Sequence, residues 1–162
     1  MNPTIEIRPI KKKDNQEIAE VIRTVLIALN APLTGTAYAD PTLETLFETY
    51  KHPNACYYVI EKNGKIVGGA GIMQLEDADP LICELQKMYF SPSVRGIGMG
   101  AKMMELCLKF AKSAGFKKCY LETLPQMKEA QRLYKKVGFN YIENRIGTTG
   151  HYSCNVWMLK DL

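Results

Sequence analysis

A predicted strand, a glycine-rich loop and an amphipathic helix, all within residues 84–115, constrain the fold more than any other segment. Glycine occupies alternate positions after Arg95, namely Gly96, Gly98 and Gly100. Glycine has no side chain, so it is favoured where a backbone turns tightly or closely approaches another group. The first amides of the following helix lack intrahelical partners and lie at the positive end of its dipole. The pattern therefore predicts that a phosphate-bearing ligand binds at this loop.

The bulk composition predicts one globular domain covering residues 1–162. Apolar residues make up 46% of the chain and charged residues 23%, both ordinary for a globular protein. The formal net charge of +4 suits an anionic small molecule or cofactor. It is too weak and too dispersed to indicate nucleic-acid binding.

The five cysteines show neither a CxxC pair nor the spacing of metal ligands. We interpret them as free thiols of a reducing compartment and expect no metal site. The first residues lack the apolar core of a signal peptide, and no apolar run approaches the ~18 residues of a membrane span. The sequence therefore predicts a cytoplasmic protein without a membrane partner.

Periodicity predicts the element order β-α-α-β-β-β-α-β-α-β-β. Strands are expected over residues 4–10, 56–61, 66–74, 81–90, 118–123, 139–143 and 152–159. Asp14, with Glu17 three residues later, is the expected N-cap of the first helix, and Asp40-Pro41 the expected start of the second. Asn63-Gly64 indicates a hairpin turn between two strands. The fold class is mixed α/β: an antiparallel front half, one right-handed parallel crossover, and helices on both faces of the sheet.

Two other classes of phosphate site also place a glycine-rich loop before a helix. Residues 96–101 also satisfy the dinucleotide signature GxGxxG/A, with Glu122 as its ribose-binding acid. However, residues 91–95 separate the loop from its strand, and a single crossover cannot build both halves of a dinucleotide fold. A P-loop is excluded because no Gly-Lys-Ser/Thr follows. A tight helix entry that binds nothing is the structural alternative.

The chain resembles the GCN5-related N-acetyltransferase (GNAT) family. Arg95-x-x-Gly98-x-Gly100 matches the family's acyl-CoA signature, Arg/Gln-x-x-Gly-x-Gly/Ala. The later residues Ala130, Leu133-Tyr134 and Gly138-Phe139 match its second motif. The resemblance implies a mixed central sheet of about seven strands flanked by about four helices. It also implies that strands 4 and 5 are parallel and splayed.

Acetyl-CoA is the cofactor that the resemblance implies, with its pantetheine arm between the splayed strands and its pyrophosphate at the loop amides. The cofactor-binding residues implied are Met88, Tyr89, Phe90, Arg95, Gly96, Ile97, Gly98, Met99, Gly100, Ala101 and Tyr134. The implied reaction transfers an acetyl group to a primary amine of a small molecule or protein, by direct attack in a ternary complex.

Three residues are candidates for the chemistry of that transfer. The amide of Phe90, left unpaired by the splay, would stabilise negative charge on the carbonyl oxygen. The hydroxyl of Tyr134 would protonate the leaving sulfur. Glu84, a carboxylate in an apolar strand, would act as base if burial raises its pKa. Glu122 is a rival for the role of base.

The acceptor site is expected between the loops at residues 33–40 and 144–151 and the hairpin strands. Its candidate residues are Thr36, Tyr38, Glu122 and His151. The plainer interpretations, an ordinary helix connector and an exposed loop histidine, stay open. So do a non-catalytic acyl-CoA sensor of the same fold, a dinucleotide-binding oxidoreductase, and association into a homodimer.

Overall fold

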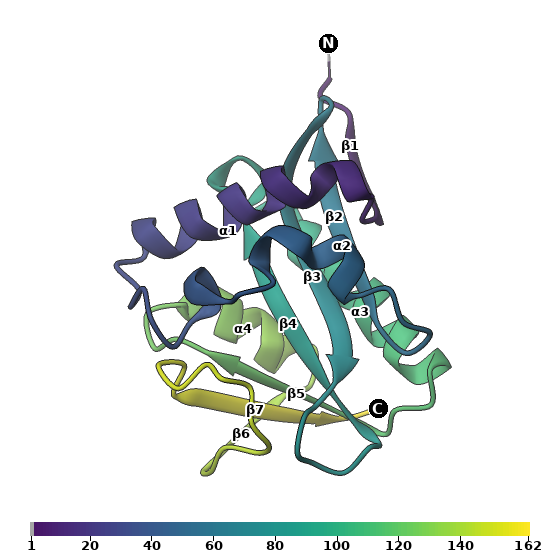
Figure 1. Cartoon of the computed structure of the whole chain (residues 1–162), viewed down its shortest axis with the longest axis vertical. Coiled ribbons are helices and arrows are strands. Elements are labelled where there is room, and N and C mark those ends of the chain that lie inside the picture. Colours follow the sequence, from purple (N-terminus) through teal and green to yellow (C-terminus); the bar gives the residue numbers. More distant parts are fainter. Residues whose placement is uncertain (1) are drawn as a thin grey trace.

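One seven-stranded sheet runs through the chain, in the order β1-β2-β3-β4-β5-β7-β6 (Figure 1). The computed structural model describes residues 2–162. All neighbouring strands are antiparallel except β4 and β5, which are parallel. The strands are β1 (Ile5–Pro9), β2 (Cys56–Lys62), β3 (Lys65–Gln74), β4 (Ile82–Phe90), β5 (Lys118–Thr123), β6 (Asn140–Ile142) and β7 (Val156–Asp161). The predicted mixed α/β class and the single parallel crossover are confirmed.

Helices cover both faces of this sheet, as predicted. They are α1 (Asn15–Ala28), α2 (Leu46–Thr49), α3 (Met99–Ser113) and α4 (Lys128–Lys136). In Figure 1, α1 and α2 lie in front of the sheet and α3 and α4 behind it. Two separate hydrophobic clusters correspond to these two layers. The sheet is therefore the middle layer of a three-layer fold.

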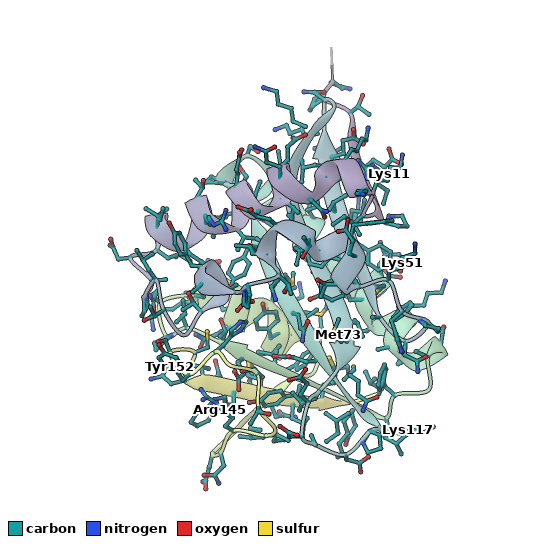
Figure 2. The ribbon with its side chains drawn as sticks, in the orientation of Figure 1. Lys11, Lys51, Met73, Lys117, Arg145 and Tyr152 are labelled. Atoms are coloured by element: carbon teal, nitrogen blue, oxygen red, sulfur yellow. The ribbon has the colours of Figure 1, made fainter. Side chains whose placement is uncertain are left out.

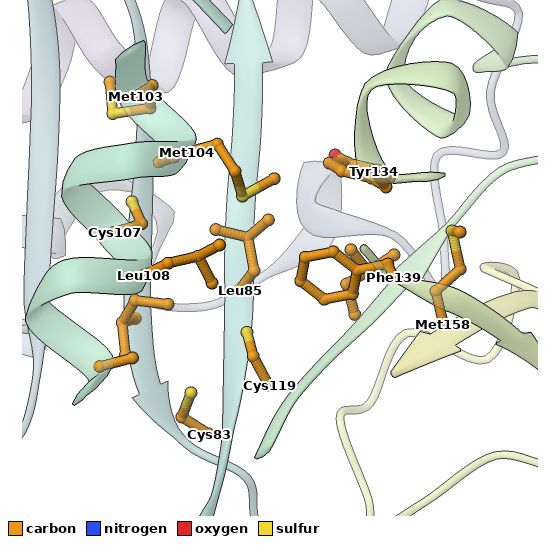
Figure 3. Packing of buried hydrophobic residues seen from close by; sticks show 14 of the residues in the cluster. Cys83, Leu85, Met103, Met104, Cys107, Leu108, Cys119, Tyr134, Phe139 and Met158 are labelled. Atoms are coloured by element: carbon orange, nitrogen blue, oxygen red, sulfur yellow. The ribbon is translucent and has the colours of Figure 1, made fainter. Parts of the chain in front are cut away.

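The α3 side of the core follows from the helical spacing of one apolar face. Met103, Met104, Cys107 and Ala111 are fully buried, each at 0% exposure, and pack against β4 and its neighbours (Figure 3). Three- and four-residue spacing places such side chains on one side of a helix. This packing fixes where the N-terminus of α3 lies relative to β4.

The predicted N-cap role of Asp14 is wrong. Its side chain makes no capping bond to α1. Instead, its carboxylate accepts hydrogen bonds from the Arg8 guanidinium at 2.8 and 3.0 Å, and both side chains are buried. Glu17 does not close a capping box either, because its carboxylate accepts from the amide of Ile66. A nearby buried cation outcompetes the helix amides for Asp14 because a charge pair is the stronger interaction.

The second helix and the last strand also differ from prediction. After Asp40 the chain forms a short 3-10 turn, Leu43–Thr45, and only one α-helical turn, α2. The last strand begins at Val156 rather than at position 152. Residues 143–155, here called the β6–β7 loop, fold instead as turns, and Arg145 and Tyr152 mark this loop in Figure 2. No helix among residues 2–162 is long and apolar enough to cross a membrane.

Candidate active site

The parallel strands β4 and β5 separate after three residue pairs. Ile82, Cys83 and Glu84 pair with β5, and the last of these pairs is Glu84 with Tyr120. Beyond it, β4 continues to Phe90 beside β3, while β5 continues to Thr123 beside β7. Figure 1 shows the two strands diverging. A gap therefore opens in the middle of the sheet, and Glu84 lies at its apex.

A bulge at Lys87 changes which face of β4 borders this gap. The register between β3 and β4 shifts between Gly69 and Gly71, and Lys87 adopts a left-handed backbone with φ of 51°. Met88 and Phe90 consequently pack against the same core as Leu85, although strict alternation would turn them to the opposite face. The bulge thus delivers the end of β4 to the side of α3 and α4.

The glycine loop leaves open space in front of the N-terminus of α3. Gly96 and Gly98 have φ of 73° and 83°, a conformation that disfavours any residue with a side chain. A β-carbon at either position would meet nothing within 4 Å. The first helical hydrogen bond runs from the amide of Lys102 to the carbonyl of Gly98. The three preceding amides of α3 therefore lack intrahelical acceptors and are suited to an anion.

The two motifs identified in the sequence meet at Gly100. A β-carbon there would lie 2.8 Å from Cδ2 of Leu133, so a side chain at this position would require Leu133 to shift. Leu133 belongs to the second motif and precedes Tyr134. The third glycine thus serves helix packing, whereas Gly96 and Gly98 keep the loop open.

The side chain of Arg95 is directed toward the end of β4 and not into the opening of the glycine loop. Its Nε and Nη2 donate to the carbonyl of Phe90 at 2.9 and 2.7 Å. Its own amide donates to the carbonyl of Pro92 at 3.3 Å. The Arg95 amide is therefore already engaged, and its side chain holds the last residue of β4.

The amide of Phe90 points into the gap between β4 and β5. The amide of Ser91 donates to the carbonyl of Val67 at 2.7 Å, and Phe90 lies opposite Gly68. Successive amides of an antiparallel strand alternate in direction, so the Phe90 amide faces away from β3. Its position matches the geometry expected for a donor left unpaired by the splay.

A cavity of about 350 Å³ extends from this gap to the glycine loop. Its walls come from α1, the end of β4, the glycine loop and α4, and they are mainly apolar. The lining residues include Val25, Leu29, Met88, Tyr89, Phe90, Arg95, Gly96, Gly100, Met127, Ala130, Leu133 and Tyr134. Six predicted cofactor-binding positions besides Tyr134 are therefore brought together around one cavity.

Tyr134 reaches this cavity from the middle of α4. It is 4% exposed, and its ring packs edge-on against Phe139 with centroids 6.0 Å apart. Figure 3 shows the hydroxyl directed from α4 toward β4. The hydroxyl has no hydrogen-bond partner among residues 2–162. Burial raises the pKa of Tyr134, so the phenol stays protonated and can donate.

Glu84 is buried, with 6% exposure, on the α1 and α2 side of β4. Burial raises its pKa to about 7, although the hydrogen bond from Gln86 opposes that rise. The negative charge of Glu122 raises the pKa further, and the positive charge of Lys87 lowers it. A carboxyl with this pKa exchanges protons readily near neutral pH.

None of the four predicted acceptor residues, Thr36, Tyr38, Glu122 and His151, lines the cavity. Thr36 is 1% exposed, and its hydroxyl donates to the carbonyl of Pro32 at 2.8 Å. It therefore shapes its own loop and does not face an acceptor. The ring of Tyr38 is half-buried beneath the guanidinium of Arg23, 5.9 Å from the ring centroid. Neither Thr36 nor Tyr38 lines the described cavity.

Glu122 and His151 are brought together through the β6–β7 loop. The Glu122 side chain is 1% exposed and lies 3.0 Å from Arg145 Nε. It accepts hydrogen bonds from the hydroxyls of Tyr120 and Thr149, each at 2.5 Å. The amide of His151 in turn donates to the Thr149 hydroxyl at 3.1 Å. With its oxygens already engaged, Glu122 is less suited than Glu84 to accept a proton.

His151 belongs to a cluster that the sequence did not predict. Its Nε2 lies 2.8 Å from Asp40, and Lys87 Nζ lies 2.8 Å from the same carboxylate. Burial would raise the pKa of Asp40, but the bond from His151 and the charge of Lys87 hold it below its ordinary value. Lys87, a lysine within the predicted strand over residues 81–90, was the one sequence signal for this cluster. The sequence carried no signal that Asp40 would be its partner.

Comparisons with known proteins place the chain in a family. Residues 24–139 match the model of the Acetyltransferase (GNAT) family. The chain is 43% identical over 157 residues to YjgM, an uncharacterized N-acetyltransferase of Escherichia coli, covering 96% of this chain and 94% of that protein. The chain therefore belongs to the GNAT family of acetyltransferases, and the resemblance seen in its motifs is confirmed.

Solved structures show the same fold at low sequence identity. A GNAT acetyltransferase from Staphylococcus aureus superposes with a TM-score of 0.81 at 20% identity, covering 98% of this chain and 99% of that one. A phosphinothricin acetyltransferase from Sinorhizobium meliloti, solved with acetyl-CoA, gives 0.77 at 20% identity, covering 98% and 89%. The splayed sheet is thus the GNAT arrangement.

Proposed function

We propose that the protein transfers an acetyl group from acetyl-CoA to a primary amine of a small molecule or protein, by direct attack in a ternary complex. One observation carries the proposal. The gap between β4 and β5 opens into a single cavity that also contains the Tyr134 hydroxyl and the edge of the glycine loop.

The residues around this cavity fit acetyl-CoA, the co-substrate of the family. The open space at Gly96 and Gly98, together with the unpaired amides of Met99, Gly100 and Ala101, suits a pyrophosphate without a metal ion. The amide of Ile97 lies in the same loop. The apolar walls suit the pantetheine arm, and the backbone of Met88, Tyr89 and Phe90 borders it. Bound acetyl-CoA supplies the thioester carbonyl that the amine attacks.

Glu84 is the proposed base. An amine with a pKa near ~10.4 must lose a proton before it attacks. A carboxylate with a pKa of about 7 is ionised in enough molecules near neutral pH to take that proton. Glu84 lies at the apex of the gap between β4 and β5, and it is not one of the residues that line the cavity.

The Phe90 amide and the Tyr134 hydroxyl act on the thioester, whereas Glu84 acts on the amine. As the nitrogen–carbon bond forms, the Phe90 amide donates to the carbonyl oxygen, on which negative charge develops. As the carbon–sulfur bond breaks, the Tyr134 hydroxyl gives its proton to the sulfur. The ammonium gives one proton to Glu84 before the attack. The second proton that the nitrogen loses as the amide forms returns to the Tyr134 oxygen, so charge and atoms balance.

The acceptor would enter between the loop containing Asp40 and the β6–β7 loop. His151 borders this approach and is joined to Asp40 at 2.8 Å. Glu122 holds the β6–β7 loop through Arg145 and Thr149. Tyr38 lies in the first of these two loops. We therefore assign His151 and Tyr38 to the rim of the acceptor site and Glu122 to its support.

Ligand stabilisation and thiol release test this function together. Acetyl-CoA and CoA should raise the melting temperature, whereas NAD(P) should not. Free thiol should then appear when an amine library is supplied with acetyl-CoA. Stabilisation by CoA without thiol release over the whole library would indicate a non-catalytic acyl-CoA sensor. Stabilisation by NAD(P) alone would indicate a dinucleotide site and contradict the proposal.

A further inference from the structure

A single side-chain amide links the proposed base to a buried tyrosine. Gln86 Nε2 donates to Glu84 Oε1 at 2.6 Å. The Tyr50 hydroxyl donates to Gln86 Oε1 at 2.5 Å. Tyr50 follows α2 directly, whereas Glu84 and Gln86 lie two residues apart on one face of β4. The three groups form a hydrogen-bonded row between two layers of the fold.

The Tyr50 hydroxyl decides which end of the Gln86 amide faces Glu84. Tyr50 is 4% exposed and packs against the ring of Tyr57 at 5.2 Å. Burial raises its pKa well above the ordinary value, so the phenol keeps its proton and needs an acceptor. Among residues 2–162, Gln86 Oε1 is that acceptor. With the amide oxygen turned to Tyr50, the amide nitrogen must face Glu84.

The orientation of this amide matters for the charge on Glu84. An N–H donor facing a carboxyl stabilises the ionised form, whereas a carbonyl oxygen stabilises the protonated form. A reversed amide would place its oxygen against Glu84 and leave the Tyr50 hydroxyl without its acceptor. The second carboxylate oxygen, Oε2, has no hydrogen-bond partner among residues 2–162. It is therefore available to receive a proton.

We propose that Tyr50 is a positioning residue for the proposed base: it holds the Gln86 amide with its N–H toward Glu84, and thereby favours the ionised form of that carboxyl and fixes its direction. The inference rests on the proposed function. It adds two residues, Tyr50 and Gln86, that line neither the described cavity nor the glycine loop.

Other titratable groups surround Glu84, and the test leaves all of them in place. They are Lys87 and Tyr89 of β4, Tyr120 and Glu122 of β5, His151 and Cys154 of the β6–β7 loop, and Asp40 beside Lys87. The carboxylates of Glu122 and Asp40 are each held by a cation. A change in Glu84 that follows the loss of the Tyr50 hydroxyl would therefore come through Gln86.

The test is a direct titration of Glu84 by carbon-13 NMR of protein labelled at the glutamate side-chain carboxyl. Glu84→Gln assigns the signal. Tyr50→Phe should raise the Glu84 pKa by about half to one unit, because the amide can then reverse. Gln86→Leu should raise it at least as far. Adding Tyr50→Phe to Gln86→Leu should change nothing more, since the amide that transmits the effect is already gone.

Tyr141→Phe is the matched control. The Tyr141 hydroxyl also donates to a glutamine, Gln131 Oε1, at 2.9 Å, but it lies on the exposed side of β6 and α4. Its removal should leave the Glu84 titration unchanged. The pH profile of kcat/KM for the best amine should also change, because the base acts when ionised. The apparent pKa of its acid limb should rise in Tyr50→Phe by the same amount as the Glu84 pKa measured by NMR.

Each outcome has a distinct meaning. A folded Tyr50→Phe protein, or a folded Gln86→Leu protein, with an unchanged Glu84 titration overturns the inference. Additive shifts in the double variant would also overturn it, because they would show that Tyr50 acts independently of Gln86. If the titration shifts as expected but the unaltered protein acetylates no amine, the orientation of the amide stands and the proposed function fails.

Discussion

Lys87 on β4 holds its ammonium 2.8 Å from the carboxylate of Asp40, and the Lys87 side chain is only 9% exposed. The same lysine has the left-handed backbone of the β4 bulge, and its carbonyl accepts a hydrogen bond from Tyr57 at 2.8 Å. The residue that directs the end of β4 into the gap is therefore fixed by partners from two other elements.

Loss of the Asp40 carboxylate should destabilise the protein, because Lys87 depends on it as the partner of its buried charge. Asp40→Asn leaves the Lys87 charge buried and without its anion, at a cost of about 3 kcal/mol in the free energy of unfolding. Adding Lys87→Met should recover part of that loss, because the uncompensated charge is removed. Chemical denaturation measures both. Asp161→Asn, which breaks the exposed Lys118–Asp161 pair, is the control and should change stability little. Additive losses would contradict the coupling.

Gly98→Ala should weaken acetyl-CoA binding about tenfold or more. The substitution forces a β-carbon into a left-handed backbone and into the space proposed for the pyrophosphate. Gly64→Ala is a matched control, since Gly64 has φ of 81° and equally open surroundings at the β2–β3 turn. Both variants should lose similar stability, but only Gly98→Ala should lose affinity in calorimetric titration. Equal affinities in the two variants would exclude the loop as the cofactor site.

Tyr134→Phe should lower kcat by about 10²–10⁴-fold, the usual contribution of a general acid. Acetyl-CoA affinity should change little, because the ring and its packing against Phe139 remain. Steady-state kinetics of thiol release and a separate binding titration distinguish the two effects. Unchanged turnover would remove Tyr134 from its proposed role.

Glu84→Gln should make the protein relatively more stable as the pH rises. The folded pKa of about 7 exceeds the value of 4.5 for a free glutamate, so the native state binds the extra proton between these values. Stability of the unaltered protein therefore falls from pH 4.5 to 7 and then levels, by at most about 3 kcal/mol. Glutamine does not titrate, so the difference between the two proteins should grow over that window. A difference independent of pH would show that the Glu84 pKa is not raised.

Local sequence patterns determined the elements that hold the proposed cofactor site. Helical spacing predicted α3, and the alternate glycines predicted a loop before it where a backbone turns tightly or an anion binds. These signals are local because backbone conformation and helix amphipathicity depend on neighbouring residues. Errors arose at Asp14, whose carboxylate pairs with Arg8 instead of capping α1, and in the second helix, which is only one turn long.

The acceptor side was decided by the tertiary structure. Thr36 was a reasonable candidate by its position, yet its hydroxyl is used within its own loop. Lys87, Asp40 and His151 come from three separate segments, and Tyr50 joins Gln86 across two layers. Such contacts depend on where the bulge turns β4 and where the β6–β7 loop folds. The sequence by itself therefore determined the family, the sheet and the glycine loop of the proposed cofactor site, because those depend on short-range patterns. Only the folded chain decided which buried charges compensate one another, because pairing of charges requires proximity in space.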